Sequence, residues 1–148
     1  MPTVLGRRRD RLALLTCAVT NEVPDPATGA VPTVGARRAV SALIDTGATV
    51  SLIDGGIASA LRLPADGSIP LVFPNSEAPE LRPAFRGALS LARDATVTAS
   101  LPWPVLVRLA SFAAGRRPFQ MILGMDILAR GDLTLEPSRA VTFSFDPF

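Results

Sequence analysis

Short apolar runs, separated by prolines and glycines, form the dominant pattern of this chain. Fourteen prolines and eleven glycines punctuate these runs, which is typical of an all-β domain. The clearest run is residues 140–145, where Val141, Phe143 and Phe145 alternate with polar residues. A period of two buries one face of a strand. The pattern therefore predicts an all-β fold.

The same pattern places the other elements. Strands are expected over residues 12–20, 39–44, 50–53, 69–73, 84–91, 96–101, 105–109, 121–123, 133–135 and 140–145. Short helices are expected over residues 56–61, where Asp54 can cap the first turn, and over residues 125–130. Residues 24–35 are expected to form a loop, and residues 74–79 the polar tip between two strands.

Composition narrows the function classes. The 148 residues are enough for one core, and we expect a single domain over residues 1–148. The net charge is +2, all 15 basic residues are Arg, and aromatic residues make up 5%, so no nucleic-acid partner is expected. The Arg-, Ala- and Pro-rich composition without Lys is typical of a GC-rich bacterial genome. No apolar run approaches the roughly 20 residues that span a membrane, so no membrane association is expected.

Several kinds of chemistry are excluded within one chain. There is no His, and Cys17 is the only cysteine, so Ser-His and Cys-His catalysis, His or Cys metal sites and an intrachain disulfide are all absent. We expect no metal and no cofactor.

The N-terminus loosely imitates a signal peptide, because three arginines precede an apolar run at residues 12–17. The run is short, and Arg11 crowds it, which favours a β-strand over a signal. Arg7 to Arg11 is then expected to be a solvated arm, and the protein is expected in the cytoplasm.

The most informative stretch is residues 43–49, Leu-Ile-Asp-Thr-Gly-Ala-Thr. Asp45 directly follows an apolar strand and enters a tight Thr-Gly turn, which is a way to hold one carboxylate at the floor of a cleft. The alternative is an Asp in an ordinary turn, where Asp and Gly are common. A second apolar strand broken by glycine, Ile122-Leu123-Gly124, follows about eighty residues later and favours the first interpretation.

With these two motifs in this order, the chain resembles the retropepsin-like aspartic proteases over about residues 12–146. The resemblance implies a closed β-barrel with one or two short helices, and a two-fold homodimer that hydrolyses peptide bonds in an extended peptide or protein substrate. Peptide hydrolysis by this route needs two carboxylates that share one proton. The chain has one Asp-Thr-Gly, so a second copy must supply the other carboxylate.

The resemblance also assigns roles. Asp45 would be the catalytic carboxylate, and Thr46 would hydrogen-bond across the dimer, although a simple turn residue is the alternative. Gly47 and Ala48 would permit close approach of the backbone near the two carboxylates.

The later motif and the hairpin between the motifs have roles as well. Ile122, Leu123 and Gly124 would support the Asp45 loop from beneath. The family's flap hairpin would lie over residues 69–91. The candidate flap-tip residues are Asn75, Ser76, Glu77 and Ala78.

Two positions depart from the retroviral pattern. Retroviral members pair an Asp, four residues after the catalytic Asp, with an Arg directly after the second-motif Gly. Here Thr49 and Met125 occupy these positions, so both charges are absent together and no unpaired buried charge remains. Asp126 is interpreted as a structural carboxylate rather than a catalytic one.

Two other functions stay open from the sequence. One is a peptide-binding or dimerisation module of the same fold that does not cleave. The retained carboxylate in Asp-Thr-Gly-Ala argues against it. The other is a plain β-barrel domain with a chance motif.

Overall fold

Strands dominate the computed structural model, which describes residues 3–22, 27–29, 37–73, 77–91, 105–138 and 140–145. The described strands are β1 (Thr3–Arg9), β2 (Leu12–Thr20), β3 (Arg37–Ile44), β4 (Leu52–Asp54), β5 (Ala65–Leu71), β6 (Glu80–Leu91), β7 (Val105–Phe112), β8 (Met121–Leu123), β9 (Gly131–Leu135) and β10 (Ala140–Phe145). The described helices are α1 (Gly55–Ala60) and α2 (Met125–Leu128). Neither of these helices is long and apolar enough to cross a membrane.

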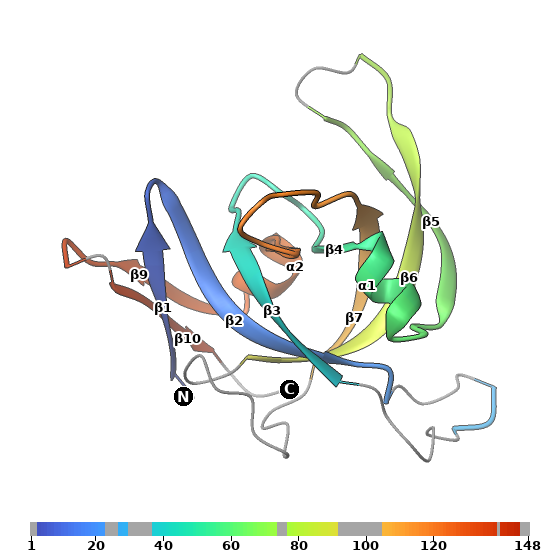
Figure 1. Cartoon of the computed structure of the whole chain (residues 1–148), viewed down its shortest axis with the longest axis horizontal. Coiled ribbons are helices and arrows are strands. Elements are labelled where there is room, and N and C mark those ends of the chain that lie inside the picture. The colour runs from blue at the N-terminus through green and yellow to red at the C-terminus, as the bar shows by residue number, and fades with distance from the viewer. Residues whose placement is uncertain are drawn as a thin grey trace.

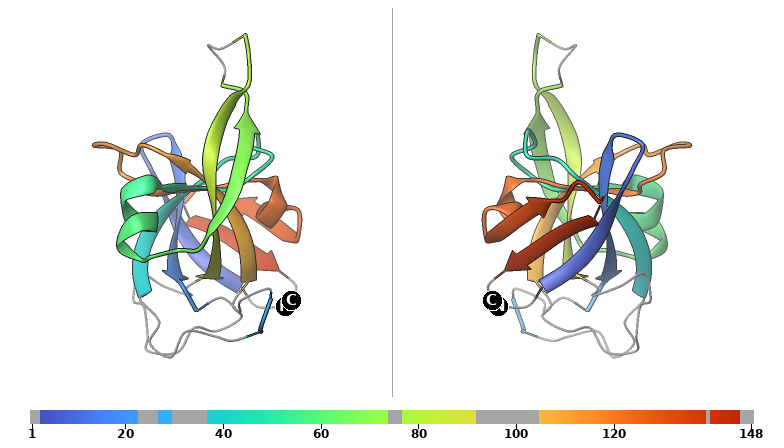
Figure 2. Two further views of the ribbon diagram at one scale, coloured as in Figure 1. Left: turned by 90° about the vertical axis from the view of Figure 1, so that its right-hand side faces the viewer. Right: turned by 90° about the vertical axis from the view of Figure 1, so that its left-hand side faces the viewer.

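The strands form one sheet in the order β5-β6-β7-β4-β8-β3-β2-β1-β10-β9. Strand β6 pairs with β7 through residues 84–89 and with β2 through residues 88–91. These two pairings close β6, β7, β4, β8, β3 and β2 into a barrel (Figure 1). The hairpin of β5 and β6 projects beyond the barrel, while β1, β10 and β9 continue the sheet on the other side (Figure 2).

Of the two apolar clusters among the described residues, the larger lies inside the barrel and extends to β10. Alternate residues of β2 contribute to it, because successive side chains of a strand point to opposite faces. Its largest fully buried side chains are Phe143, Leu15, Ile53, Leu89, Leu91, Leu109, Met121, Leu123, Val19 and Val141. This cluster fixes the strands on which the candidate site stands.

The expected strands over residues 12–20, 121–123 and 140–145 are confirmed at both boundaries. Other boundaries differ from the expected ones. Strand β5 begins at Ala65 and β6 at Glu80, which in both cases is four residues before the apolar run that predicted the strand. Backbone pairing between these two strands extends into polar residues, which carry no hydrophobic signal. The strand expected over residues 96–101 lies outside the described residues.

The solvated arm expected for Arg7 to Arg11 is wrong. Strand β1 lies between β10 and β2 and pairs antiparallel with both. Glycine makes this possible, because a Cβ at Gly6 would lie 2.2 Å from the Leu14 carbonyl oxygen. Arg7 and Arg9 point to solvent, so the charges mark the exposed face of a strand rather than a free segment.

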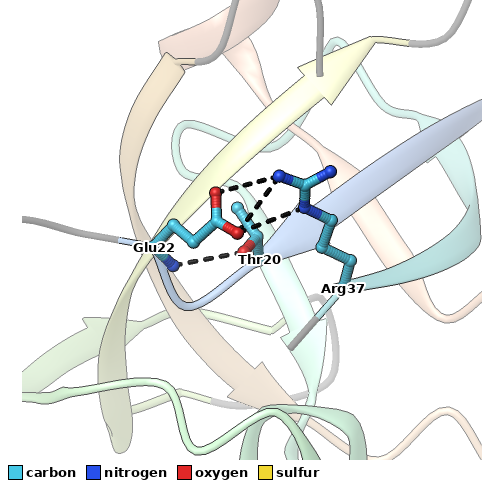
Figure 3. A network of polar contacts seen from close by, with 3 residues as sticks. All are labelled: Thr20, Glu22 and Arg37. Atoms are coloured by element: carbon cyan, nitrogen blue, oxygen red, sulfur yellow. Dashed lines mark hydrogen bonds and ion pairs between the residues drawn. The ribbon is translucent and has the colours of Figure 1, made fainter. Parts of the chain in front are cut away.

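An exposed ion pair joins Arg37, the first residue of β3, to Glu22, two residues beyond the end of β2 (Figure 3). The Nη2 atom of Arg37 donates to both carboxylate oxygens of Glu22, at 3.1 and 3.2 Å. The backbone N–H of Glu22 donates to the Thr20 hydroxyl at 3.2 Å. Because both charged side chains are about one third exposed, we expect this pair to contribute little to stability.

Phe143→Ala tests the alternating pattern of β10. The side chain of Phe143 is fully buried, so the truncation leaves a cavity and should lower the free energy of unfolding by about 3–5 kcal/mol. Thr142→Ala, on the other face of the same strand, should cost about 1 kcal/mol or less. Urea denaturation measures both values, and similar losses would contradict the assigned faces.

Candidate active site

Asp45 stands where two parallel strands end side by side. Strand β3 pairs with β8 in parallel, with Ile44 opposite Leu123. The backbone N–H of Asp45 donates to the Leu123 carbonyl oxygen at 3.0 Å. The structure thus joins the two sequence motifs through backbone hydrogen bonds, and Asp45 is the first residue beyond the paired strands.

The Asp45 carboxylate organises its own turn. Its Oδ1 atom accepts from the backbone N–H of Gly47 at 2.9 Å, and the Ala48 N–H donates to the Asp45 carbonyl oxygen at 3.2 Å. This is the local hydrogen bonding that Asp provides in turns. Asp45 is half-buried, while Thr46 and Gly47 are exposed. The turn therefore exposes Thr46, Gly47 and part of Asp45 to solvent at this end of the barrel.

Gly124 lies directly beneath the Asp45 loop. A Cβ at this position would be 2.6 Å from the Val50 carbonyl oxygen and 2.9 Å from the Ala48 carbonyl oxygen. The backbone of Gly124 is extended, so glycine is required by this close packing rather than by its conformation. The next residue, Met125, donates its N–H to the Ala48 carbonyl oxygen at 2.8 Å. The second motif therefore supports the loop through its backbone.

A buried serine ties the same loop to α2. The Ser51 hydroxyl donates to Oδ1 of Asp126 at 2.7 Å, and the Ser51 N–H donates to Oδ2 at 3.0 Å. The N–H of Gly124 in turn donates to the Ser51 hydroxyl oxygen at 3.0 Å. Ser51 is fully buried, so each of these groups depends on the others for a partner.

The two positions that carry a charge pair in retroviral members take no part in this network. Thr49 and Met125 are both exposed and hold no such bond to each other, whereas Asp126 takes both donors of Ser51. Asp126 thus has a structural contact, as the sequence indicated. Ser51 is a site residue that the sequence did not indicate. The only signal for it was a hydroxyl within an otherwise apolar run at residues 50–53.

The second apolar cluster lies on the outer side of the barrel. Registered pairing across β3, β8, β4, β7 and β6 aligns five apolar residues, which we call the outer apolar row: Leu43, Ile122, Leu52, Ala110 and Ala84. The resemblance implied the same supporting role for Ile122 and Leu123. The structure separates them, because Leu123 is fully buried inside the barrel and Ile122 is half-buried on the opposite face.

The β5–β6 hairpin packs on this row at its base. Ile69 and Ala84 are buried in the same cluster as Leu52, and Leu71 packs against it. We call this side of the hairpin its inner face. Farther out the hairpin stands clear of the barrel (Figures 1 and 2). Of the predicted tip residues, Glu77 and Ala78 are exposed. Asn75 and Ser76 lie outside the described residues.

The described residues offer neither a reactive cysteine nor a metal centre. Burial raises the pKa of the Cys17 thiol to about 12, so it is protonated at neutral pH and is a poor nucleophile or metal ligand. The described residues contain no group of three or more His, Cys, Asp or Glu side chains placed to hold a metal ion.

Comparisons with known proteins bear on the fold. No family model and no curated protein sequence matches the chain. Among solved structures, the chain is similar to the crystal structure of a retropepsin-like aspartic protease from Rickettsia conorii. The TM-score is 0.56 and the identity 13%, over 97% of this chain and 91% of that one. The chain therefore has the mostly β, retropepsin-like fold.

Ser51→Ala tests the buried network. The substitution leaves the Gly124 N–H and the Asp126 carboxylate each without one partner, so the free energy of unfolding should fall by about 1–3 kcal/mol. Ser59→Ala, at an exposed position of α1, is the matched control and should change it by less than about 0.5 kcal/mol. Equal values in chemical denaturation would show that the Ser51 hydroxyl does not hold the loop.

Proposed function

We propose that this protein is an aspartic endopeptidase that acts as a homodimer. The observation that carries the proposal is the placement of Asp45. Its carboxylate accepts from the Gly47 N–H in a Thr-Gly turn at the end of β3, and its backbone N–H donates to the Leu123 carbonyl oxygen. This turn stands on a fold shared with an aspartic protease. The proposal extends this likeness from the fold to the activity.

The chemistry needs two carboxylates close together. Like charges about 3 Å apart do not both ionise readily, so two Asp45 side chains in contact would share one proton. The ionised carboxylate then acts as a base towards a water molecule, while the protonated one donates to the carbonyl oxygen of the scissile bond. A two-fold axis beside the Asp45 turn would bring the second carboxylate from the partner subunit.

The residues around Asp45 suit a crowded dimer contact. Thr46 and Gly47 are exposed, so the Thr46 hydroxyl is accessible for a hydrogen bond to the partner's turn. A Cβ at Gly47 would lie 3.2 Å from Oδ1 of Asp45, which is tighter than most such contacts. Ala48 is half-buried and small. These properties support the positioning roles proposed for the three residues.

The proposed substrate is a peptide in extended conformation. It would lie along the half-buried part of the outer apolar row, at Leu43 and Ile122, and under the outer part of the inner face of the β5–β6 hairpin. Asp45 follows Leu43 by two residues and would lie beside the peptide. Main-chain hydrogen bonds would supply much of the affinity, and pockets for alternate side chains the selectivity. The half-buried Leu43 and Ile122 favour aliphatic or aromatic side chains at this surface.

Asp45→Asn should lower the rate of cleavage of an unfolded protein substrate by roughly 10²- to 10⁴-fold, because the amide cannot act as a base. Asp10→Asn is the matched control. Asp10 is exposed in the β1–β2 turn with a positive φ of 55°, a conformation that Asn tolerates. The measurement is peptide release between acidic and neutral pH. Equal cleavage by the wild type and Asp45→Asn would overturn the role of Asp45.

A mixing experiment tests the shared site. If both subunits contribute Asp45, then equal amounts of wild type and Asp45→Asn should leave about one quarter of the dimers fully wild type after subunit exchange. Activity at a fixed amount of wild type should then fall to about half. Adding Asp10→Asn instead should cause no fall. Unchanged activity on adding Asp45→Asn would show that each chain acts alone.

A further inference from the structure

The inner face of the β5–β6 hairpin carries charges as well as apolar side chains. Residues directly opposite in an antiparallel pair share a face, and Arg82 lies opposite Ile69 while Glu80 lies opposite Leu71. Ile69 is 8% exposed in the cluster of the outer apolar row. Arg82 and Glu80 therefore extend from the side of the hairpin that packs on this row.

Arg82 is held in place by two contacts. Its Nη2 atom donates to Oε2 of Glu80 at 2.9 Å, and its guanidinium carbon lies 5.2 Å from the centroid of the Phe73 ring. Its Nε atom is shielded from solvent and has no hydrogen-bond partner among the described residues. These contacts place the guanidinium on this side of the hairpin, and the bond to Glu80 does not use its Nη1 atom.

The ion pair between Glu80 and Arg82 contributes little to the stability of the fold. Glu80 and Arg82 lie on the same strand, so the pair does not join β5 to β6. Their side chains are 50% and 37% exposed, and such pairs contribute little to stability. Glu80 is therefore a partner that another carboxylate can replace.

We propose that Arg82 is a specificity-determining residue that selects an acidic side chain in the bound peptide. The inference rests on the proposed function, because it uses the same peptide path between row and hairpin. Arginine binds a carboxylate through two parallel hydrogen bonds, which favours Glu or Asp over neutral residues. Successive side chains of an extended peptide point to opposite sides. The acidic residue then lies one position from an aliphatic residue that contacts the outer apolar row.

A peptide series tests the charge preference. One cleavable peptide with an aliphatic residue at the scissile bond is varied at each flanking position among Glu, Gln and Lys. At one of the flanking positions, the kcat/KM of wild type should be about fivefold higher for the Glu peptide than for the Gln peptide. The kcat/KM for the Lys peptide should be lower still. The Glu-to-Gln ratio within each variant is the readout, because it cancels any general loss of activity.

Three variants connect this ratio to the hairpin. Arg82→Gln should reduce the ratio to about one, and Glu80→Gln should raise it, because the competing carboxylate is gone. Arg11→Gln, in the exposed β1–β2 turn, is the matched control and should keep the wild-type ratio. High salt should lower the ratio in wild type, since the interaction is between partly exposed charges.

Binding separates this inference from the proposed cleavage. Fluorescein-labelled forms of the same peptides are titrated into Asp45→Asn with and without Arg82→Gln, and dissociation constants are measured by anisotropy. An acidic preference that depends on Arg82, without cleavage by wild type, would uphold the inference and overturn the endopeptidase. Cleavage by wild type with a Glu-to-Gln ratio of about one at every position would uphold the endopeptidase and overturn the role of Arg82. Peptides that bind equally well, or not at all, in Asp45→Asn would also overturn the inference.

Discussion

The close crossing of residues 48–50 over Gly124 is the constraint on which the candidate site depends. Parallel pairing of β3 with β8 brings Asp45 to the carbonyl oxygen of Leu123, and the chain must then turn back across the strand it has just joined. Only a residue without a side chain leaves room for the carbonyl oxygens of Ala48 and Val50. The position of the Asp45 carboxylate thus follows from backbone packing about eighty residues away in sequence.

Buried hydrogen bonds hold the same loop in place. Ser51 and Asp126 connect the loop to α2 through a buried hydroxyl and a carboxylate that satisfy each other and the N–H of Gly124. The carboxylate remains half-buried rather than fully enclosed, which limits its desolvation. One hydroxyl and one carboxylate therefore join two segments without a buried ion pair, whose desolvation can exceed its Coulombic gain.

The barrel has two apolar surfaces that differ in how far they are covered. The interior cluster is closed and holds the strands in register, whereas the outer apolar row runs from the Asp45 end towards the hairpin and is only partly covered. Both surfaces come from the same strands, because alternate residues point to opposite faces. Ile122 and Leu123 show the consequence, since adjacent apolar residues in one motif lie on opposite sides of the barrel wall.

The sequence by itself determined the local features: the alternation in β10, the Asp54 cap of α1 and the turn that follows β3. In each of these, the interacting atoms lie within a few residues of one another. Tertiary structure alone decided that β1 joins the sheet, that Ser51 meets Asp126, and that Arg82 shares a face with Ile69. The bond from Ser51 to Asp126 spans 75 residues, and no local pattern encodes which distant partner a polar side chain will find. Hydrophobic periodicity assigns a residue to a face, but only the register between strands decides what that face meets.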